Sequence, residues 1–144
     1  MPQVVRSALV HFSAQAMFDL VNDVARYPEF IAGCAETKIT ESTDEHMQAS
    51  LLIAKAGIKQ WFTTKNQLAA AKNINMQLVD GPFKQLSGDW IFTALADDAC
   101  KIELNLSFEF SSKIVELAFG KVFNAIATNM VDAFVARAKE IHSD

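Results

Sequence analysis

The 144-residue sequence lacks the features that mark membrane-spanning and disulfide-stabilised proteins. No uninterrupted apolar run approaches the roughly 18 residues that a membrane-spanning helix needs. Two cysteines, Cys34 and Cys100, are too few for a disulfide framework. The start of the chain has no signal-peptide layout, because Arg6 interrupts its apolar positions. We therefore expect one soluble, cytoplasmic domain over residues 1–144, with both thiols reduced.

Signatures of catalysis are also missing. The histidines His11, His46 and His142 have no metal-ligand spacing with one another or with the cysteines. No G-x-S-x-G, phosphate-binding glycine loop or dinucleotide fingerprint occurs. Asp23 could form an acid–base pair with nearby groups, but we favour a salt-bridge or helix-capping role. We predict no metal site, no catalytic residue and no enzyme activity.

Proline is absent from the stretch Lys113–His142, and glycine occurs there once, as Gly120. Apolar residues recur at intervals of three and four with polar residues opposite, which is typical of an amphipathic helix. Such a helix would be about 45 Å long. Its apolar side is predicted to hold Val115, Phe119, Val122, Phe123, Ile126, Met130, Phe134 and Ile141. A helix of this length needs a large apolar partner surface from the rest of the chain.

The rest of the chain is predicted to supply that surface as a sheet. Val4–Phe12 favours a strand, Ser13 could cap a helix over 14–22, and 23–30 favours a short second helix or turn. Alternating patterns then predict strands at 36–42, 46–56, 59–69, 73–79, 85–95 and 99–110. The predicted fold is α+β, in the order β-α-α-β6-α: a helix-grip fold in which a curved, seven-stranded antiparallel sheet surrounds the long C-terminal helix. A curved sheet does not close evenly on a straight helix, so we expect an elongated apolar cavity between them.

Two segments carry a family resemblance. Val21–Phe30, followed by Gly33 and Cys34, is similar to the motif V-x-D-V-x-x-Y-P-x-F-x-P-x-C, and Gly81–Phe92 resembles a second landmark, G-P-F-K-x-L-x-G-x-W-x-F. Both belong to the coenzyme Q-binding START-domain family of the polyketide cyclase/START-like superfamily. The chain most resembles its bacterial branch, the ribosome-association toxins. Ala32 replaces the motif's second proline, so we expect a less rigid loop there.

The resemblance implies two functions. One is binding of ubiquinone, as a carrier or chaperone that supports respiratory electron transport. The alternative is binding of the large ribosomal subunit, which blocks subunit joining. Of the two we expect the ubiquinone function, with no covalent cofactor. Peripheral contact with the inner membrane would fit the first function, and neither function involves DNA.

The candidate ligand-binding residues are aromatic and apolar. They are Tyr27, Phe30, Trp90, Phe92, Phe119, Val122, Phe123, Ile126 and Met130. Two roles stay open for Tyr27 and Phe30. They could turn the chain and fill the core, or they could rim the cavity, where the phenol would offer a hydrogen bond to a quinone carbonyl. The phenylalanines of the long helix could likewise serve packing, ligand contact or both.

Acidic residues are absent from His46 to Val79, a stretch that carries Lys55, Lys59, Lys65 and Lys72. The rest of the chain therefore carries a net charge of −8, with nine basic against seventeen acidic residues. We call these four lysines the basic wing. They could be a solvated sheet face that resists aggregation, or a contact surface for ribosomal RNA or lipid headgroups. Because no RNA-recognition motif or arginine cluster is present, we expect no specific base recognition.

Overall fold

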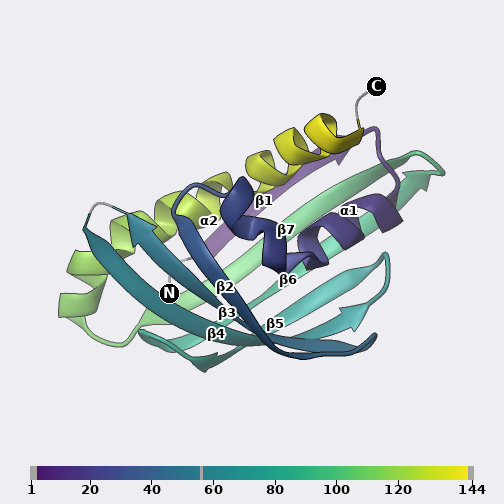
Figure 1. Ribbon diagram of the computed structural model, residues 1–144. Coiled ribbons are helices and arrows are strands. Elements are labelled where there is room, and N and C mark those ends of the chain that lie inside the picture. The colour runs from purple at the N-terminus through teal and green to yellow at the C-terminus, as the bar shows by residue number, and fades with distance from the viewer. Residues whose placement is uncertain (1–2, 56, 143–144) are drawn as a thin grey trace.

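A seven-stranded antiparallel sheet curves around one long helix in the computed structural model, which describes residues 3–55 and 57–142 (Figure 1). The strands lie side by side in the order β1-β7-β6-β5-β4-β3-β2. The elements are β1 (Gln3–Val10), α1 (Ala14–Asn22), the 3₁₀ helix η1 (Val24–Glu29), β2 (Cys34–Ser42), β3 (His46–Lys55), β4 (Ile58–Ala69), β5 (Asn73–Asp80), β6 (Phe83–Ala96), β7 (Ala99–Phe110) and α2 (Lys113–His142). The predicted helix-grip fold and element order are confirmed.

The element boundaries depart from the predicted ones by one or two residues. The strand predicted over Val4–Phe12 ends at Val10, because pairing with β7 stops at the Val10–Cys100 pair. Phe12 leaves the sheet and its ring lies 5.4 Å from that of His142. Strand β2 begins two residues earlier than predicted because Cys34 pairs with Ile53. Residue 56, the predicted end of another strand, lies outside the described residues.

Local interactions explain how the chain passes from β1 through α1 and η1 into β2. The Ser13 hydroxyl accepts a hydrogen bond from the amide of Ala16 at 3.0 Å, which confirms Ser13 as the N-cap of α1. Pro28 lies inside η1, whose short 3₁₀ form fits the predicted short helix or turn. Gly33 then adopts a φ of 92°, a conformation that favours glycine, and turns the chain into β2.

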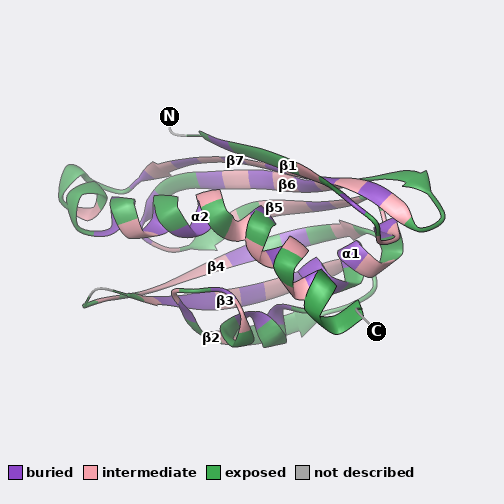
Figure 2. Ribbon diagram, turned by 90° about the horizontal axis from the view of Figure 1, so that it is seen from above, coloured by how far each residue is buried: buried purple, intermediate pink, exposed green. Residues whose placement is uncertain are grey.

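The core lies between α2 and the concave face of the sheet. Figure 2 shows buried residues alternating with less buried ones along the strands beneath α2. The buried residues of α2 are Phe119, Gly120, Phe123, Ile126, Ala127, Val131, Phe134 and Ala138. The predicted inward orientation of Phe119, Phe123 and Phe134 is therefore confirmed.

The helix face was predicted less well near its edges. Val115, Val122 and Met130 are only half-buried, and Val131 is buried although the pattern did not include it. Ile141 is wrong as an inward residue: it is 48% exposed, because every residue of the final turn is exposed. By length and composition alone α2 could span a membrane, which the interrupted apolar pattern did not suggest. Here it packs as the core helix against the sheet.

Candidate ligand-binding site

A cavity of about 80 Å³ lies between α2 and the sheet. Its walls come from η1 and the residues after it, from the inner faces of β3, β4, β5, β6 and β7, and from α2. Small side chains contribute to its wall from both the sheet and the helix. Ala49 of β3 is the register partner of Thr64 of β4, and Ala127 contributes a methyl group from the helix. The predicted helix–sheet cavity is present, in a small form.

Five of the nine predicted ligand-binding residues line this cavity. They are Tyr27, Trp90, Phe123, Ile126 and Met130. Their contact with a ligand stays a prediction.

The other four predicted residues do not reach the cavity. Phe92 shares the inward face of β6 with Trp90 but lies further along the strand, where its ring packs 5.7 Å from that of Phe18 in α1. Phe119 belongs to an aromatic cluster that fills the core near the start of α2, where its ring lies 6.1 Å from that of Phe110. Val122 is half-buried beside that cluster, and Phe30 lines a neighbouring pocket. These four were predicted from residue type and from their place on a helix, strand or turn, and neither property fixes where empty space remains.

The sequence pattern missed the polar part of the wall. Thr64 and Asn66 line the cavity from β4 and are 6% and 7% exposed. The two-residue alternation of β4 indicates their orientation, because it places Thr64 and Asn66 on the same strand face as Phe62. Polar residues on an inward strand face need a partner. This signal could have identified them.

Tyr27 lines the cavity, but its hydroxyl is bonded within the protein. The hydroxyl donates a hydrogen bond to the carbonyl of Val21. Burial raises the pKa of Tyr27 well above its ordinary value, with smaller contributions from Cys34 and Asp23. The donor of this phenol is used within the protein, which favours the packing role for Tyr27. A hydrogen bond to a quinone carbonyl would require this bond to break, and it stays a prediction.

Cys34 also keeps its polar group occupied. Its thiol contacts the carbonyl of Glu36 at 3.9 Å, and burial raises the pKa of Cys34 to about 11. A thiol with so high a pKa is neutral and a poor nucleophile near neutral pH. Cys34 therefore acts as an apolar wall residue.

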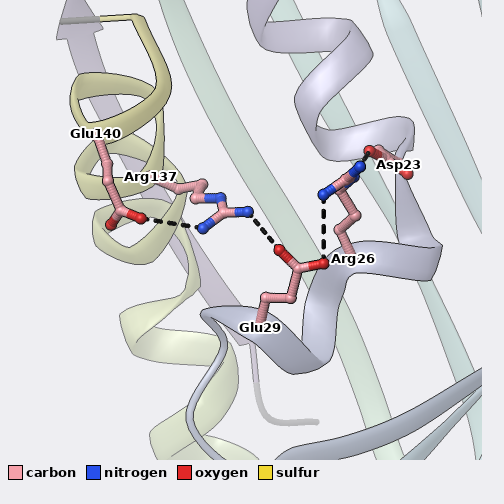
Figure 3. A network of polar contacts seen from close by, with 5 residues as sticks. All are labelled: Asp23, Arg26, Glu29, Arg137 and Glu140. Atoms are coloured by element: carbon pink, nitrogen blue, oxygen red, sulfur yellow. Dashed lines mark hydrogen bonds and ion pairs between the residues drawn. The ribbon is translucent and has the colours of Figure 1, made fainter.

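A chain of ion pairs fastens η1 to the C-terminal part of α2 (Figure 3). Arg137 lies 2.6 Å from Glu29 and 3.1 Å from Glu140. Arg26 extends the chain, at 3.4 Å from both Glu29 and Asp23. Asp23 thus forms an exposed salt bridge, as the favoured interpretation predicted, and it is absent from the cavity wall.

This ion-pair chain lies next to a pocket that neighbours the cavity, through the contact of Arg137 with Phe30. A second pocket of about 130 Å³, here called the outer pocket, lies between α2 and the loop after η1. It shares Ile31, Ile126 and Met130 with the cavity, so these three side chains lie between the two pockets. The guanidinium of Arg137 lies 5.1 Å from the ring centre of Phe30, another residue of the outer pocket.

Comparison with known proteins agrees with this architecture. The family model described as "Polyketide cyclase / dehydrase and lipid transport" matches residues 10–135. The chain belongs to this family. A START superfamily protein from Mycobacterium smegmatis has the same fold, with a TM-score of 0.80 at 18% identity over 96% of this chain and 98% of that one.

Two sequence relatives of this family member have names that point in different directions. The ribosome association toxin RatA of Vibrio cholerae is 58% identical over 144 residues, which is 100% of both chains. The mitochondrial coenzyme Q-binding protein COQ10 of Drosophila melanogaster is 24% identical over 138 residues, covering 93% of this chain and 57% of that protein.

The four lysines of the basic wing do not form one patch on this START-like domain. All four are exposed. Lys55 and Lys59 flank the β3–β4 turn, whereas Lys72 lies in the β4–β5 turn at the opposite end of the sheet. The 12 residues of β4 that separate these ends span about 40 Å at about 3.3 Å per residue. Lys65 lies between them on the outer face.

The two ends of the sheet differ in charge and in apolar exposure. The end that holds the β3–β4 turn also holds the start of α2, because successive antiparallel strands reverse direction. We call it the helix-start end. It presents Lys55 and Lys59, and it exposes Ile114 by 79% and Leu117 by 77%. The opposite end carries the acidic turn residues Asp44, Glu45, Asp97 and Asp98.

Proposed function

We propose that the protein associates with the ribosome, binding the large subunit and opposing subunit joining. The observation that carries this proposal is the 58% identity over the full length of both chains to a relative named ribosome association toxin. The helix-start end supports it, because exposed lysines attract phosphate and exposed apolar side chains favour a macromolecular contact. A ribosome-bound protein would work in the cytoplasm.

Separate charge reversals at the two ends of the sheet test this proposal. We expect Lys55→Glu with Lys59→Glu to weaken co-sedimentation with purified large subunits, because four units of charge change beside the proposed contact. The matched control, Lys72→Glu with Lys139→Glu, makes the same change at the opposite end and should leave co-sedimentation unchanged. Wild-type binding should also weaken as salt rises. Absence of wild-type co-sedimentation at low salt would refute the proposal, whereas equal loss in both variants would move the contact away from the helix-start end.

A second function, binding of an apolar ligand in the cavity, is favoured by a separate observation. The cavity wall is apolar apart from a few side chains, and among residues 3–55 and 57–142 no lysine, arginine, aspartate or glutamate lines it. The family's lipid-transport description and the coenzyme Q-binding relative make an isoprenoid quinone the first ligand to test. Burial of such a molecule contributes about 25 cal/mol per Å² of apolar surface.

The size of the cavity restricts how such a ligand enters. At about 80 Å³ it is smaller than the cavity of about 150 Å³ that holds benzene in an engineered protein. A quinone ring therefore requires wall side chains to move. Met76 and Met130 are the flexible, half-buried side chains of the wall, and methionine adapts readily to a change of shape. The isoprenoid tail would extend past Met130 into the outer pocket.

Filling the cavity tests the ligand function. Ala127→Leu adds three carbons to the helix wall, and we expect it to reduce decylubiquinone binding at least tenfold. Ala136→Leu makes the same change at an exposed position of the same helix and should leave binding unchanged. Organic extraction of gently purified wild-type protein, followed by mass spectrometry, would identify a natural ligand. If wild-type protein carries no lipid and binds no added quinone, the ligand function is wrong.

A further inference from the structure

Two buried polar residues stand out among the described residues, Thr64 and Asn66 at 6% and 7% exposure. They occupy consecutive inward positions of β4 and both line the cavity. Burial of an amide in an apolar surrounding is unfavourable unless its donors and acceptors are bonded. Their position therefore calls for partners, either within the protein or on a ligand.

The protein satisfies this pair only in part. The Thr64 hydroxyl donates a hydrogen bond to Oδ1 of Asn66 at 3.0 Å. Within residues 3–55 and 57–142, Nδ2 of Asn66 has no hydrogen-bond partner. Tyr27 and Cys34 also line the cavity, but they donate to the carbonyls of Val21 and Glu36 and form no hydrogen bond with Asn66. Asn66 thus presents an unused donor on the cavity wall.

The surroundings hold this donor in an apolar site. Met47 and Met76 are the register partners of Asn66 on the two neighbouring strands. The β4–β5 register shifts between Thr63 and Thr64, and such bulges change the direction of side chains beside binding sites. The outer pocket receives no residue from β4, so Asn66 lies on the inner wall.

We propose that Nδ2 of Asn66 donates a hydrogen bond to a neutral oxygen acceptor of the cavity ligand, and that Thr64 is a positioning residue that holds the amide. This inference rests on the proposed ligand function and specifies its chemistry. The ligand is an apolar molecule with a carbonyl or ether oxygen at its inner end, as in a quinone ring. A plain hydrocarbon lacks the acceptor. A fatty-acid anion is disfavoured, because no cationic side chain of the described part of the chain lines the cavity.

A pair of matched probes isolates this hydrogen bond. Duroquinone and durene share a tetramethylated six-membered ring, but durene lacks the two carbonyl oxygens. Equilibrium dialysis would measure both with the full chain. We expect wild-type protein to prefer duroquinone, and Asn66→Leu to lower duroquinone affinity by about three- to tenfold while durene affinity stays the same or rises.

Two further variants separate recognition from folding. Thr64→Val keeps the side-chain shape, removes the hydroxyl that holds the amide, and should weaken the preference for duroquinone by a smaller factor than Asn66→Leu. Thr63→Val is the matched control, because Thr63 bonds to Ser50 on the outer face and is absent from the cavity wall. It should leave both affinities unchanged. Thermal unfolding would verify that each variant is folded.

The outcomes distinguish the two proposals. If wild-type protein binds both probes without preference, or if Asn66→Leu lowers both affinities equally, the role of Asn66 is wrong while the ligand function stands. If wild-type protein binds neither probe nor decylubiquinone, the ligand function fails and the role of Asn66 fails with it.

Discussion

Gly33 should be far less tolerant of alanine than Gly57, although both have a left-handed backbone. Their φ angles are 92° and 81°. A Cβ at Gly33 would lie 2.7 Å from Cδ1 and 3.1 Å from Cγ1 of Ile126, whereas a Cβ at Gly57 would have no neighbour within 4 Å. The two substitutions therefore share the backbone strain and differ mainly in the contact with Ile126, which joins the loop after η1 to α2 between the cavity and the outer pocket.

The expected magnitudes follow from these geometries. The left-handed backbone disfavours alanine by roughly 1–2 kcal/mol, partly offset because alanine also restricts the unfolded chain by about 0.4–1 kcal/mol. Gly57→Ala should therefore lower the free energy of unfolding by about 1 kcal/mol or less. Gly33→Ala should lower it by about 1–3 kcal/mol more, because Ile126 must move into the space it shares with the cavity.

Urea unfolding followed by tryptophan fluorescence measures both effects. Ile126→Val removes Cδ1, the atom that the new methyl group would meet. In that background we expect Gly33→Ala to be no more destabilising than Gly57→Ala, with a coupling energy of about 1–2 kcal/mol in the double-mutant cycle. Equal effects of the two glycine substitutions in the wild-type background, or zero coupling with Ile126→Val, would refute the proposed contact between position 33 and Ile126.

Three other substitutions test the contacts around the cavity. Tyr27→Phe should lower the free energy of unfolding by about 1–2 kcal/mol, because the Val21 carbonyl loses its buried donor, and calorimetry should show an unchanged duroquinone affinity. Arg137→Lys should destabilise by about 1 kcal/mol in denaturant titrations, because a lysine cannot bond to Glu29 and Glu140 in the same way; no change would make the ion-pair chain irrelevant to stability. Burial raises the pKa of Cys34 from 9.0 to about 11, so the thiolate forms first in the unfolded chain and stability should fall between pH 9 and 11 by about 1.4 kcal/mol per unit. In Cys34→Ala, stability should fall less steeply over this pH range. An unaltered slope would argue against burial of the Cys34 thiol as the cause.

The fold was predictable because its signals are periodic and local. The alternation of β7 and the three- and four-residue spacing of α2 each follow from the geometry of one element, and both elements have their predicted bounds. The Ser13 cap needs only its own turn. The predicted burial of Ile141 was wrong because the helix continues past the surface that buries its other apolar residues. Periodicity carries no information on where a partner surface ends.

The candidate site was predictable only in part because its properties arise across elements. Ala49, Thr64 and Ala127 come from three elements, and the space between them depends on which small side chains meet. The prediction that the basic wing forms one surface was wrong for a similar reason. Lys59 and Lys72 are close in sequence, but the length of β4 and the turns at its two ends separate them.

The most direct test of the central proposal is a subunit-joining experiment with the wild-type protein. Purified small and large ribosomal subunits would be mixed under conditions that allow joining, with and without a molar excess of the protein, and separated on a sucrose gradient. We predict fewer joined ribosomes, more free subunits, and the protein in the large-subunit fractions. An unchanged gradient profile, with the protein remaining at the top of the gradient, would contradict the proposed function.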